Sequence, residues 1–440
     1  MIPKLRFPEF RDKEEWDVTT FDKIYSFYVT NSFSRDELTY QKGTVKNIHY
    51  GDIHTKFSTL FDIKNEKVPS INPLIEIKKI PSESYCIEGD MIFADASEDL
   101  KDVGKSIEIV NINHEKLVSG LHTILARQIQ KKLIVGFGGY LFKSDWIRTQ
   151  IQKEAQGAKV LGISAKRLST INIAYPTNHL EQQKIAATLS SLDDLITAQS
   201  EKIKALQAHK KSLMQQLFPA EGERVPRLRF PEFLGEGDWE EVSLGQKVDS
   251  LSGYPFKSIE ISEDSRGIPL LRGINITEGF IRHSKDIDRY FLGNTQQLQK
   301  YRLQINDLVI GMDGSKVGKN SSLITKNESG SLLIQRVACL RTKDKETISI
   351  EFIFQQINSN KFHTYVERIN TSGGIPHISI NQINEFMIGF PSFAEQQKIA
   401  ATLSSLDDLI KTQNQKLEAL KKHKKGLMQQ LFPNPIEETV

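Results

Sequence analysis

The strongest constraint on this chain is a close internal repeat. Residues 181–219 read EQQKIAATLSSLDDLITAQSEKIKALQAHKKSLMQQLFP, and residues 395–433 read EQQKIAATLSSLDDLIKTQNQKLEALKKHKKGLMQQLFP. Aligned without gaps, the two segments match at 30 of their 39 positions. A repeat of this kind indicates one structural unit that is used twice. The fold should therefore have an internal pseudo-two-fold plan.

A second, shorter repeat precedes each long one. PKLRFPEF at 3–10 and PRLRFPEF at 226–233 are each followed, six residues after the last phenylalanine, by a tryptophan, Trp16 and Trp239. Each half of the chain therefore consists of a short motif, a long variable region and a copy of the long repeat.

The length of the chain also favours two domains. A single hydrophobic core stops growing at roughly 250 to 300 residues, and this chain has 440 residues of which 38% are hydrophobic. We predict a first domain at 1–180, a helix at 181–219, a second domain at 220–394 with a linker at 220–225, a second helix at 395–433, and a tail at 434–440.

The two variable regions differ in most of their sequence but keep short matches. These are Val-Gly-Lys at 103–105 and 317–319, Arg127 and Arg341, and the similar segments 89–92 and 306–309. The first two pairs keep the 214-residue offset of the long repeat. We expect the two domains to share a fold and to differ in their surfaces.

The variable regions have the pattern of mixed α/β domains. Short apolar runs bounded by Gly, Asp or Asn are typical of strands, and we predict strands within 91–96, 133–138, 169–175 and 308–312. Helices are expected near 143–155 and 351–368. The glycines at 136, 138 and 139 are interpreted as a turn between strands rather than a nucleotide-binding loop.

The long repeats have the heptad pattern of a coiled coil. Apolar positions alternate at spacings of four and three residues. The seam positions are Ile185, Leu189, Leu192, Ile196, Gln199, Ile203, Leu206 and Leu213 in the first copy, and Ile399, Leu403, Leu406, Ile410, Gln413, Leu417, Leu420 and Leu427 in the second. The predicted fold class is α+β, with two similar domains separated by two long helices that form an antiparallel coiled coil. The alternative is that each helix packs only on its own domain.

Polar seam positions allow two finer predictions. If the helices pair about a local two-fold, Gln199 and Gln413 should meet and fix the register. Lys210 and Lys424 continue the seam, and we expect their ammonium groups to extend to solvent rather than to be buried.

Composition excludes several classes of protein. No stretch approaches the roughly 20 apolar residues of a membrane-spanning helix, and the N-terminus lacks the apolar segment of a signal peptide, so we expect a cytoplasmic protein without a membrane partner. Cys86 and Cys339 are too few for a disulfide framework or a four-ligand zinc site and are expected to be reduced and buried. The net charge of +3 permits nucleic-acid binding without requiring it.

Signatures of catalysis are missing from the sequence. There is no Pro-Pro dipeptide for an amino-methyltransferase loop and no Pro-Asp for one type of nuclease motif. The Gly104-Lys105-Ser106 segment ends like a P-loop, but Asp99 stands where the first glycine is required. The histidines do not show metal-ligand spacing, and the pair His49 and His54 is expected in a surface loop. We therefore predict a binding protein with no catalytic residue and no metal site.

The order of these segments resembles one family over essentially the whole chain. An LRFPEF-type opening, a variable region that ends in an apolar strand and a proline, EQQKIAATLSSLDDLI and then HKKSLMQQLFP, all present twice, is similar to the specificity subunit of type I restriction-modification systems.

The resemblance implies a function and partners. Each variable region would be a target recognition domain that reads one half of an asymmetric bipartite site in double-stranded DNA, and the helices would set the gap between the halves. The partners would be two methyltransferase subunits and the motor-nuclease subunits. S-adenosylmethionine, ATP and Mg would bind those partners, so we expect this chain to bind no cofactor.

Candidate DNA contacts are chosen by side-chain chemistry and position. Lys105 and Lys319, in the two Val-Gly-Lys elements, could donate to phosphates, or could simply be solvated loop lysines. His54, Lys56, Arg272 and Asn275 lie in polar, loop-like segments and have side chains that can pair with base edges.

Two other functions stay open on the sequence. A tandem coiled-coil adaptor that binds only proteins would explain the repeated helices but not two divergent domains. A self-sufficient methyltransferase would have to bind S-adenosylmethionine without the loop that is missing here.

Overall fold

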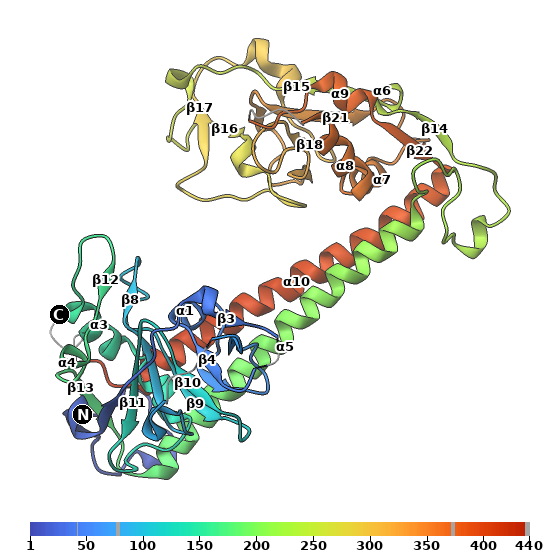
Figure 1. Ribbon diagram of the computed structural model, residues 1–440. Helices are drawn as coiled ribbons and strands as arrows, with labels where there is room; N and C mark the ends of the chain where they lie inside the picture. Colours follow the sequence, from blue (N-terminus) through green and yellow to red (C-terminus); the bar gives the residue numbers. More distant parts are fainter. Residues whose placement is uncertain (42, 76–79, 371–374, 436–440) are drawn as a thin grey trace. The chain divides into compact units, whose positions relative to one another are not determined.

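The computed structural model describes residues 1–41, 43–75, 80–370 and 375–435 (Figure 1). It consists of two compact units. Unit 1 comprises Met1–Gln199 and Lys416–Val440, and unit 2 comprises Ser200–Gln415. Each unit thus contains one variable region together with one end of each long helix. Most of the predicted tail at 434–440 lies outside the described residues.

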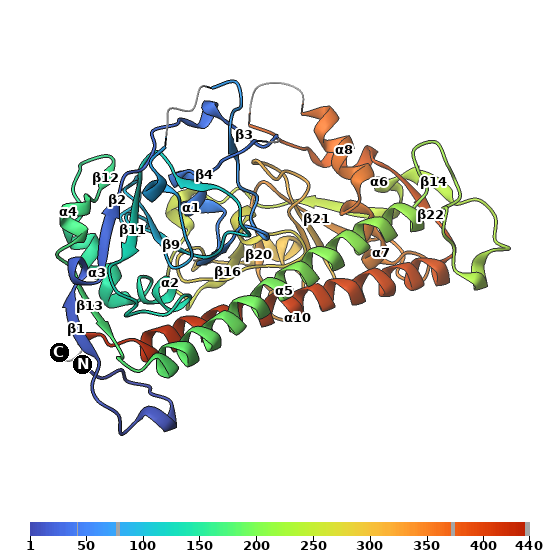
Figure 2. The same cartoon turned by 60° about the horizontal axis from the view of Figure 1, so that its bottom comes forward.

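The two long repeats are helices, as the heptad pattern predicts. Helix α5 spans His179–Leu217 and α10 spans Phe393–Leu431, and a proline follows each helix two residues after its end. In unit 1 the first turns of α5 share a core with the last turn of α10, through Ile185 and Leu189 with Leu431. In unit 2 the last turn of α5 shares a core with the first turns of α10. The helices therefore run antiparallel within each unit (Figure 2).

The heptad positions face inward along both helices. Every predicted seam side chain from Ile185 to Leu427 is buried or half-buried, whereas Leu195 and Leu409, which are off the seam, are exposed. Gln199 belongs to unit 1 and Gln413 to unit 2, so their meeting stays a prediction.

We expect the seam lysines to extend to solvent, and this prediction is wrong. The Lys210 ammonium lies 2.6 Å from a carboxylate oxygen of Asp407, and the Lys424 ammonium lies 2.5 Å from Asp193. The lysine side chains are only 14% and 16% exposed. The two ion pairs are equivalent under the 214-residue offset, and each joins the two helices within one unit.

Unit 1 contains four sheets and three apolar clusters within the described residues. A five-stranded sheet has the order β2-β11-β7-β9-β5, a four-stranded sheet has the order β10-β4-β6-β3, and β1-β13 and β12-β8 form two-stranded pairs. The strands are β1 Asp17–Thr20, β2 Tyr25–Tyr28, β3 Leu38–Thr39, β4 Lys46–Ile48, β5 Leu60–Asp62, β6 Ser70–Ile71, β7 Met91–Ala94, β8 Ala96–Ser97, β9 Ser106–Asn111, β10 Leu117–Ser119, β11 Thr123–Gln128, β12 Leu161–Gly162 and β13 Asn172–Tyr175. The short helices are α1 Tyr50–Thr55, α2 Phe137–Leu141, α3 Asp145–Glu154 and α4 Ala165–Leu168.

Unit 2 repeats this plan with fewer strands. Its sheets have the orders β15-β21-β18-β19, β17-β16-β20 and β14-β22. The strands are β14 Glu240–Ser243, β15 Val248–Ser252, β16 Ile268–Leu271, β17 Arg289–Phe291, β18 Leu308–Gly311, β19 Ser321–Leu323, β20 Leu332–Leu333, β21 Val337–Thr342 and β22 Met387–Phe390. The helices are α6 Leu244–Lys247, α7 Ile350–Ile357, α8 Asn360–Ile369 and α9 Ile380–Glu385.

Three local predictions are corrected by the structure. The segment 133–138 is not a strand: it enters α2, and Gly136 takes a left-handed conformation at the helix start, so the glycines do not form a turn between strands. The predicted helix at 351–368 is two helices, α7 and α8. His49 and His54 do not lie in a surface loop, because His49 is buried and caps α1, which contains His54.

The opening motif fastens each domain to the start of a long helix. The guanidinium of Arg6 donates to both carboxylate oxygens of Glu181 at 2.8 Å, and Arg229 pairs with Glu395 at 2.9 and 2.7 Å. In both pairs each side chain is at most 6% exposed. A bidentate Arg-carboxylate pair fixes orientation as well as distance, which explains why this motif and the EQQ segment occur together twice.

The next residue of each helix adds a second attachment. The side-chain amide of Gln182 donates to the carbonyls of Lys132 and Pro176 and accepts from the Ile134 N–H. Gln396 makes the corresponding bonds to Thr347, Pro391 and Ser349.

The motif tryptophans lie between the start of one helix and the end of the other. Trp16 contacts the ring of Phe432 at 6.2 Å between centroids, and Trp239 contacts Phe218 at 6.5 Å. Phe432 and Phe218 follow directly after α10 and α5. Each domain is therefore held by two helix ends that are distant in the sequence.

Candidate nucleic-acid interface

Each domain has an ion pair between a half-buried arginine and a buried aspartate. Arg127 on β11 binds the carboxylate of Asp90 through two hydrogen bonds of 2.8 and 2.7 Å, and Arg341 on β21 binds Asp307 through two of 2.7 Å. Hydrogen bonding to the carboxylates raises the pKa of both arginines above the ordinary value. The matched arginines and the segments 89–92 and 306–309 thus form one shared scaffold element.

Burial also raises the pKa of both cysteine thiols, which are free and lie near these ion pairs. This agrees with the expectation of reduced, buried cysteines.

The two Val-Gly-Lys elements form the same turn. Gly104 and Gly318 have φ of +63° and +72°, a left-handed conformation that favours glycine. A Cβ at Gly104 would lie 2.6 Å from a methyl of Ile151 on α3, and one at Gly318 would lie 2.9 Å from a methyl of Val366 on α8. The glycine allows the turn to approach a helix closely in both domains.

The lysines after these glycines have different neighbours. The ammonium of Lys105 donates to the backbone carbonyl of His54 at 2.7 Å, whereas Lys319 pairs with Glu367 on α8 at 3.0 Å. Lys105 also lies 3.7 Å from Asp102, so both lysines have an acidic partner, but these partners come from different elements.

In unit 1 the structure brings the three predicted contact residues together around α1. Besides the bond from Lys105, the Nε2 atom of His54 lies 3.0 Å from the Ala96 carbonyl. Lys56 pairs with Asp52 at 2.8 Å and its side chain is 49% exposed. Lys56 also bonds the hydroxyl of Tyr40 and lies over its ring. These residues form a small basic and aromatic patch.

The acid beneath this patch is held as a carboxylate. Burial of Asp52 opposes ionisation, but hydrogen bonds from Arg35 and Lys56 outweigh it, and the pKa of Asp52 falls below the ordinary value. The same carboxylate holds two cationic side chains, which are 41% and 49% exposed.

In unit 2 the predicted pair Arg272 and Asn275 lies in one turn, and the two side chains have different surroundings. Asn275 is 1% exposed, and its amide donates to Asp288 at 3.0 Å and to the Arg282 carbonyl at 3.2 Å. A buried, satisfied amide stabilises the turn, which argues against Asn275 as a base reader. Arg272 is half-buried and bonds the Ile287 carbonyl.

Exposed side chains that the sequence reading missed surround the same turn of unit 2. Ile274 and Phe280 are 45% and 52% exposed, and Arg282 and His283 are exposed beside them. A second missed pair, His122 and Arg336, occupies equivalent positions in the two domains. Non-glycine residues with positive φ could not be identified from residue type alone.

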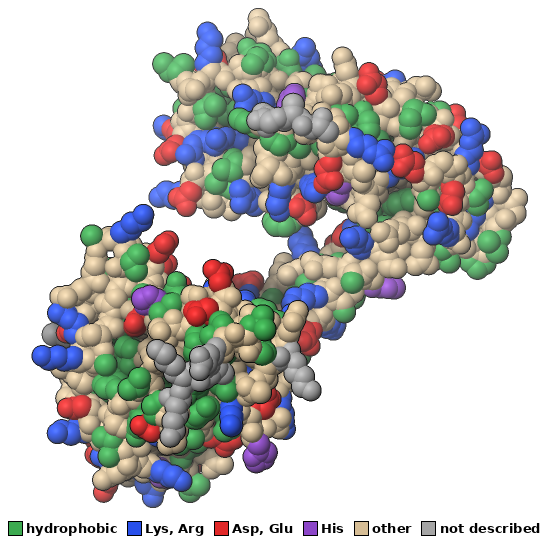
Figure 3. Space-filling model, in the orientation of Figure 1, with side chains coloured by type: hydrophobic (Ala, Val, Ile, Leu, Met, Phe, Trp, Pro, Cys, Tyr) green, Lys and Arg blue, Asp and Glu red, His purple; other side chains and the backbone are tan. Residues whose placement is uncertain are grey.

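Charge is dispersed over both domains. In the face shown in Figure 3, Lys and Arg side chains alternate with Asp and Glu, which agrees with the small net charge of +3. Binding to DNA would therefore depend on local patches.

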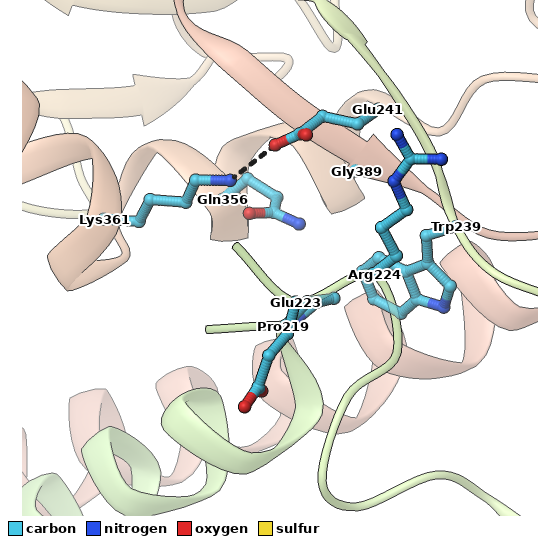
Figure 4. A pocket seen from close by; sticks show the side chains of 8 residues that line it. All are labelled: Pro219, Glu223, Arg224, Trp239, Glu241, Gln356, Lys361 and Gly389. Atoms are coloured by element: carbon cyan, nitrogen blue, oxygen red, sulfur yellow. Dashed lines mark hydrogen bonds and ion pairs between the residues drawn. The ribbon is translucent and has the colours of Figure 1, made fainter. Parts of the chain in front are cut away.

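Unit 2 also has a small pocket beside its motif tryptophan (Figure 4). Lys361 and Glu241 point toward one another across it, with 3.3 Å between the ammonium and the carboxylate, and Arg224 and Trp239 line another side.

Within the described ranges no group of three or more His, Cys, Asp or Glu side chains could hold a metal ion. No helix in the described part of the chain is long and apolar enough to cross a membrane.

Comparison with known proteins identifies the family. The model of the type I restriction modification DNA specificity domain matches residues 14–208 and again 236–422. The chain belongs to this family. Its members are the non-catalytic, DNA-specificity components of type I restriction-modification complexes, as the arrangement of the repeats predicts.

Relatives span most of the chain. The specificity subunit of the type I restriction enzyme MjaVIII of Methanocaldococcus jannaschii is 28% identical over 68% of this chain and 70% of that protein. The putative MjaX specificity subunit of the same organism is 24% identical over 96% and 94%.

Solved structures share the fold at low identity. The S subunit of a type I restriction-modification system from M. genitalium has a TM-score of 0.60 at 17% identity, over 99% of this chain and all of that one. A chain from a study of complex assembly and conformational transition of a type I R-M system has a TM-score of 0.56 at 15% identity, over 98% and 100%.

Proposed function

We propose that this specificity-family chain reads an asymmetric, bipartite site in double-stranded DNA, one half with each domain. The observation that carries the proposal is a common scaffold with unlike surfaces. The Arg-Asp pair and the glycine turn occur in both domains, while α1 of unit 1 and the Arg272–Asn275 turn of unit 2 present different side chains. Two different readers imply two different half-sites.

The helices are proposed to set the gap between the half-sites. Each is a continuous run of 39 residues, which at about 1.5 Å per residue is longer than the roughly 34 Å turn of B-DNA. Since each mismatched base pair costs roughly 1–3 kcal/mol, two short half-sites on one rigid spacer give far more discrimination than either alone.

The proposal includes the partners. Two methyltransferase subunits would methylate adenine at the site, and motor-nuclease subunits would join for restriction. S-adenosylmethionine, ATP and Mg would bind to those subunits, and the complex would act in the cytoplasm.

Mapping methylated adenines in DNA exposed to the complex of this chain with its methyltransferase subunits tests the proposal. We expect one bipartite motif with unlike halves. Replacing residues 17–180 with the matching region of another family member should change one half only. Inserting four residues into the seam should change the gap or prevent assembly, because the insertion shifts the heptad phase. A change in both halves after the exchange would contradict the assignment.

A further inference from the structure

Two turns that the sequence reading did not single out occupy the same place in the two domains. His122 directly precedes β11 and Arg336 directly precedes β21. The carbonyl of His122 accepts from the Asp95 N–H at 3.1 Å, and that of Arg336 accepts from the Met312 N–H at 2.9 Å.

The next bond in each turn is also conserved between the units. The Asp95 carbonyl accepts from the Ile163 N–H and the Met312 carbonyl from the Ile378 N–H, both at 2.8 Å. The equivalence of the two positions therefore rests on backbone hydrogen bonding, and the 214-residue offset agrees with it.

Both residues have a positive φ, which is uncommon for residues other than glycine. Their φ values are +55° and +66°. Glycine adopts this conformation without strain, whereas residues with bulky side chains adopt it rarely. Such strain is tolerated at positions where the side chain has a function. The conformation also directs the side chain outward at the start of a buried strand: the His122 side chain is 52% exposed and that of Arg336 is 70% exposed.

A carboxylate orients each side chain. The Nδ1 atom of His122 lies 3.2 Å from Asp95, and Nη1 of Arg336 lies 2.9 Å from Asp313. Because Asp95 lies beside His122 and Asp313 pairs with Arg336, these two positions add little net positive charge to the surface. This favours recognition of hydrogen-bonding groups over general attraction to phosphates.

The residues around His122 are aromatic and basic. The ring of His122 lies edge-on to Tyr50 on α1, with 5.3 Å between centroids; α1 contains His54 and is followed by Lys56. In unit 2, Asp313, which pairs with Arg336, forms a β-bridge with His377.

We propose that His122 and Arg336 are specificity-determining residues that contact base edges, one in each half-site. This rests on the proposed function and assigns the residues that carry it out. Arginine typically pairs in a bidentate manner with O6 and N7 of guanine, so Arg336 is assigned to a guanine in the half-site of the second domain. His122 is assigned to one base pair in the other half-site.

Glycine variants test the proposal without impairing the fold. In His122→Gly and Arg336→Gly the new residue accepts the positive φ, so thermal unfolding should occur at the same or a higher temperature. His114→Gly is a matched control, since His114 is exposed and has φ of +58°. In the sequence, His114 precedes β10 and His122 follows it. Arg266→Gly controls for an exposed, Asp-paired arginine.

The measurement is methylation of a library of variant sites by the assembled complex at several salt concentrations. Arg336→Gly should lower discrimination at one base pair of one half-site by about tenfold to a hundredfold, and His122→Gly should lower it at one position of the other half. The salt dependence of binding should not change, and the two controls should leave the recognised site intact.

The outcomes separate the two levels of inference. If the unmodified complex recognises no bipartite site, the proposed function fails. If it does so but both glycine variants keep full discrimination, these residues are not the readers. A uniform loss of affinity with a salt slope reduced by about one would identify phosphate contacts and would overturn the assignment to bases.

Discussion

Units 1 and 2 share the ion pairs and turns that form their scaffold, and they differ in other core and surface side chains. The Arg-Glu attachment, the Arg-Asp pair and the glycine turn are present in both. By strand register, Glu108 of unit 1 is opposite Met91, while Leu323 is opposite the equivalent Leu308 in unit 2. A buried acid in one domain thus corresponds to an aliphatic side chain in the other, which shows that a core position can diverge while the attachments to the helices do not.

The tryptophans show a second difference between the units. The indole N–H of Trp16 donates to Glu181 at 3.2 Å. The indole nitrogen of Trp239 is buried and has no hydrogen-bond partner within the described residues. The attachment in unit 1 thus contains one more hydrogen bond.

Removing the attaching arginines should have the largest effect. Arg6→Ala and Arg229→Ala each leave a carboxylate that is 1% exposed without its main partner, and breaking such a pair costs about 3–5 kcal/mol. Arg229→Ala should be the more damaging, since Glu395 lacks the indole donor that Glu181 keeps. Urea denaturation of the full chain measures both, with the exposed Arg266→Ala as a control. Equal losses would show that the indole bond contributes nothing.

The buried acid should make the stability of unit 1 depend on pH. Burial raises the pKa of Glu108 to about 7 from 4.5, although the Gly136 and Gly139 N–H groups donate to it. The folded state therefore binds the proton more tightly than the unfolded state. The contribution of Glu108 to stability should be fully present below about pH 4.5 and should be lost as pH rises through 7, by up to about 3 kcal/mol.

Glu108→Gln should remove this dependence, measured as the urea midpoint between pH 5 and 8. The exposed Glu98→Gln should retain it. A Glu108→Gln variant with the slope of the unmodified chain would exclude Glu108 as its source.

Alanine in the glycine turns should cost about 1–3 kcal/mol. Gly104→Ala should cost more than Gly318→Ala because its Cβ would approach a neighbouring methyl at 2.6 Å rather than 2.9 Å. Gly314→Ala is the control for backbone strain alone, since its φ is +92° and no atom lies within 4 Å of the added Cβ. Thermal unfolding ranks the three variants, and a larger loss for Gly314→Ala would contradict the packing argument.

Replacing the tryptophans should have the smallest differential effect. Trp16→Phe loses ring area and a hydrogen bond to a charged group, whereas Trp239→Phe loses ring area only. The difference in unfolding free energy should be about 1–2 kcal/mol. A greater loss for Trp239→Phe would imply that its indole nitrogen is satisfied in solution.

The sequence predicts the parts of this fold that depend on a periodic pattern or on a repeated motif. The heptads predict the helices because the spacing of four and three residues matches the helical turn over the eight seam positions of each copy, and Val-Gly-Lys marks a turn that only glycine fits well. The segments 89–92 and 306–309 also indicate a shared element, but the pairing of Asp90 with Arg127 depends on strand register, which the sequence does not reveal.

The errors have equally physical causes. The run 133–138 was predicted as a strand because a short apolar segment has no periodicity that separates a strand from a buried helix start. Asn275 was predicted as a reader from its chemistry, which does not reveal that its amide is satisfied internally. The sequence does not single out His122 and Arg336, because neither residue type by itself predicts a left-handed backbone conformation.

The attachment of helix ends has a consequence for the order in which the chain is made. Phe432 and Leu431 belong to the same core as Trp16, so a segment of unit 1 that is translated before unit 2 is completed by residues that are translated after unit 2. Unit 2, by contrast, is one contiguous segment, Ser200–Gln415. During synthesis unit 2 can therefore complete its core before unit 1, whose apolar surface stays open until the last turn of α10 has been made.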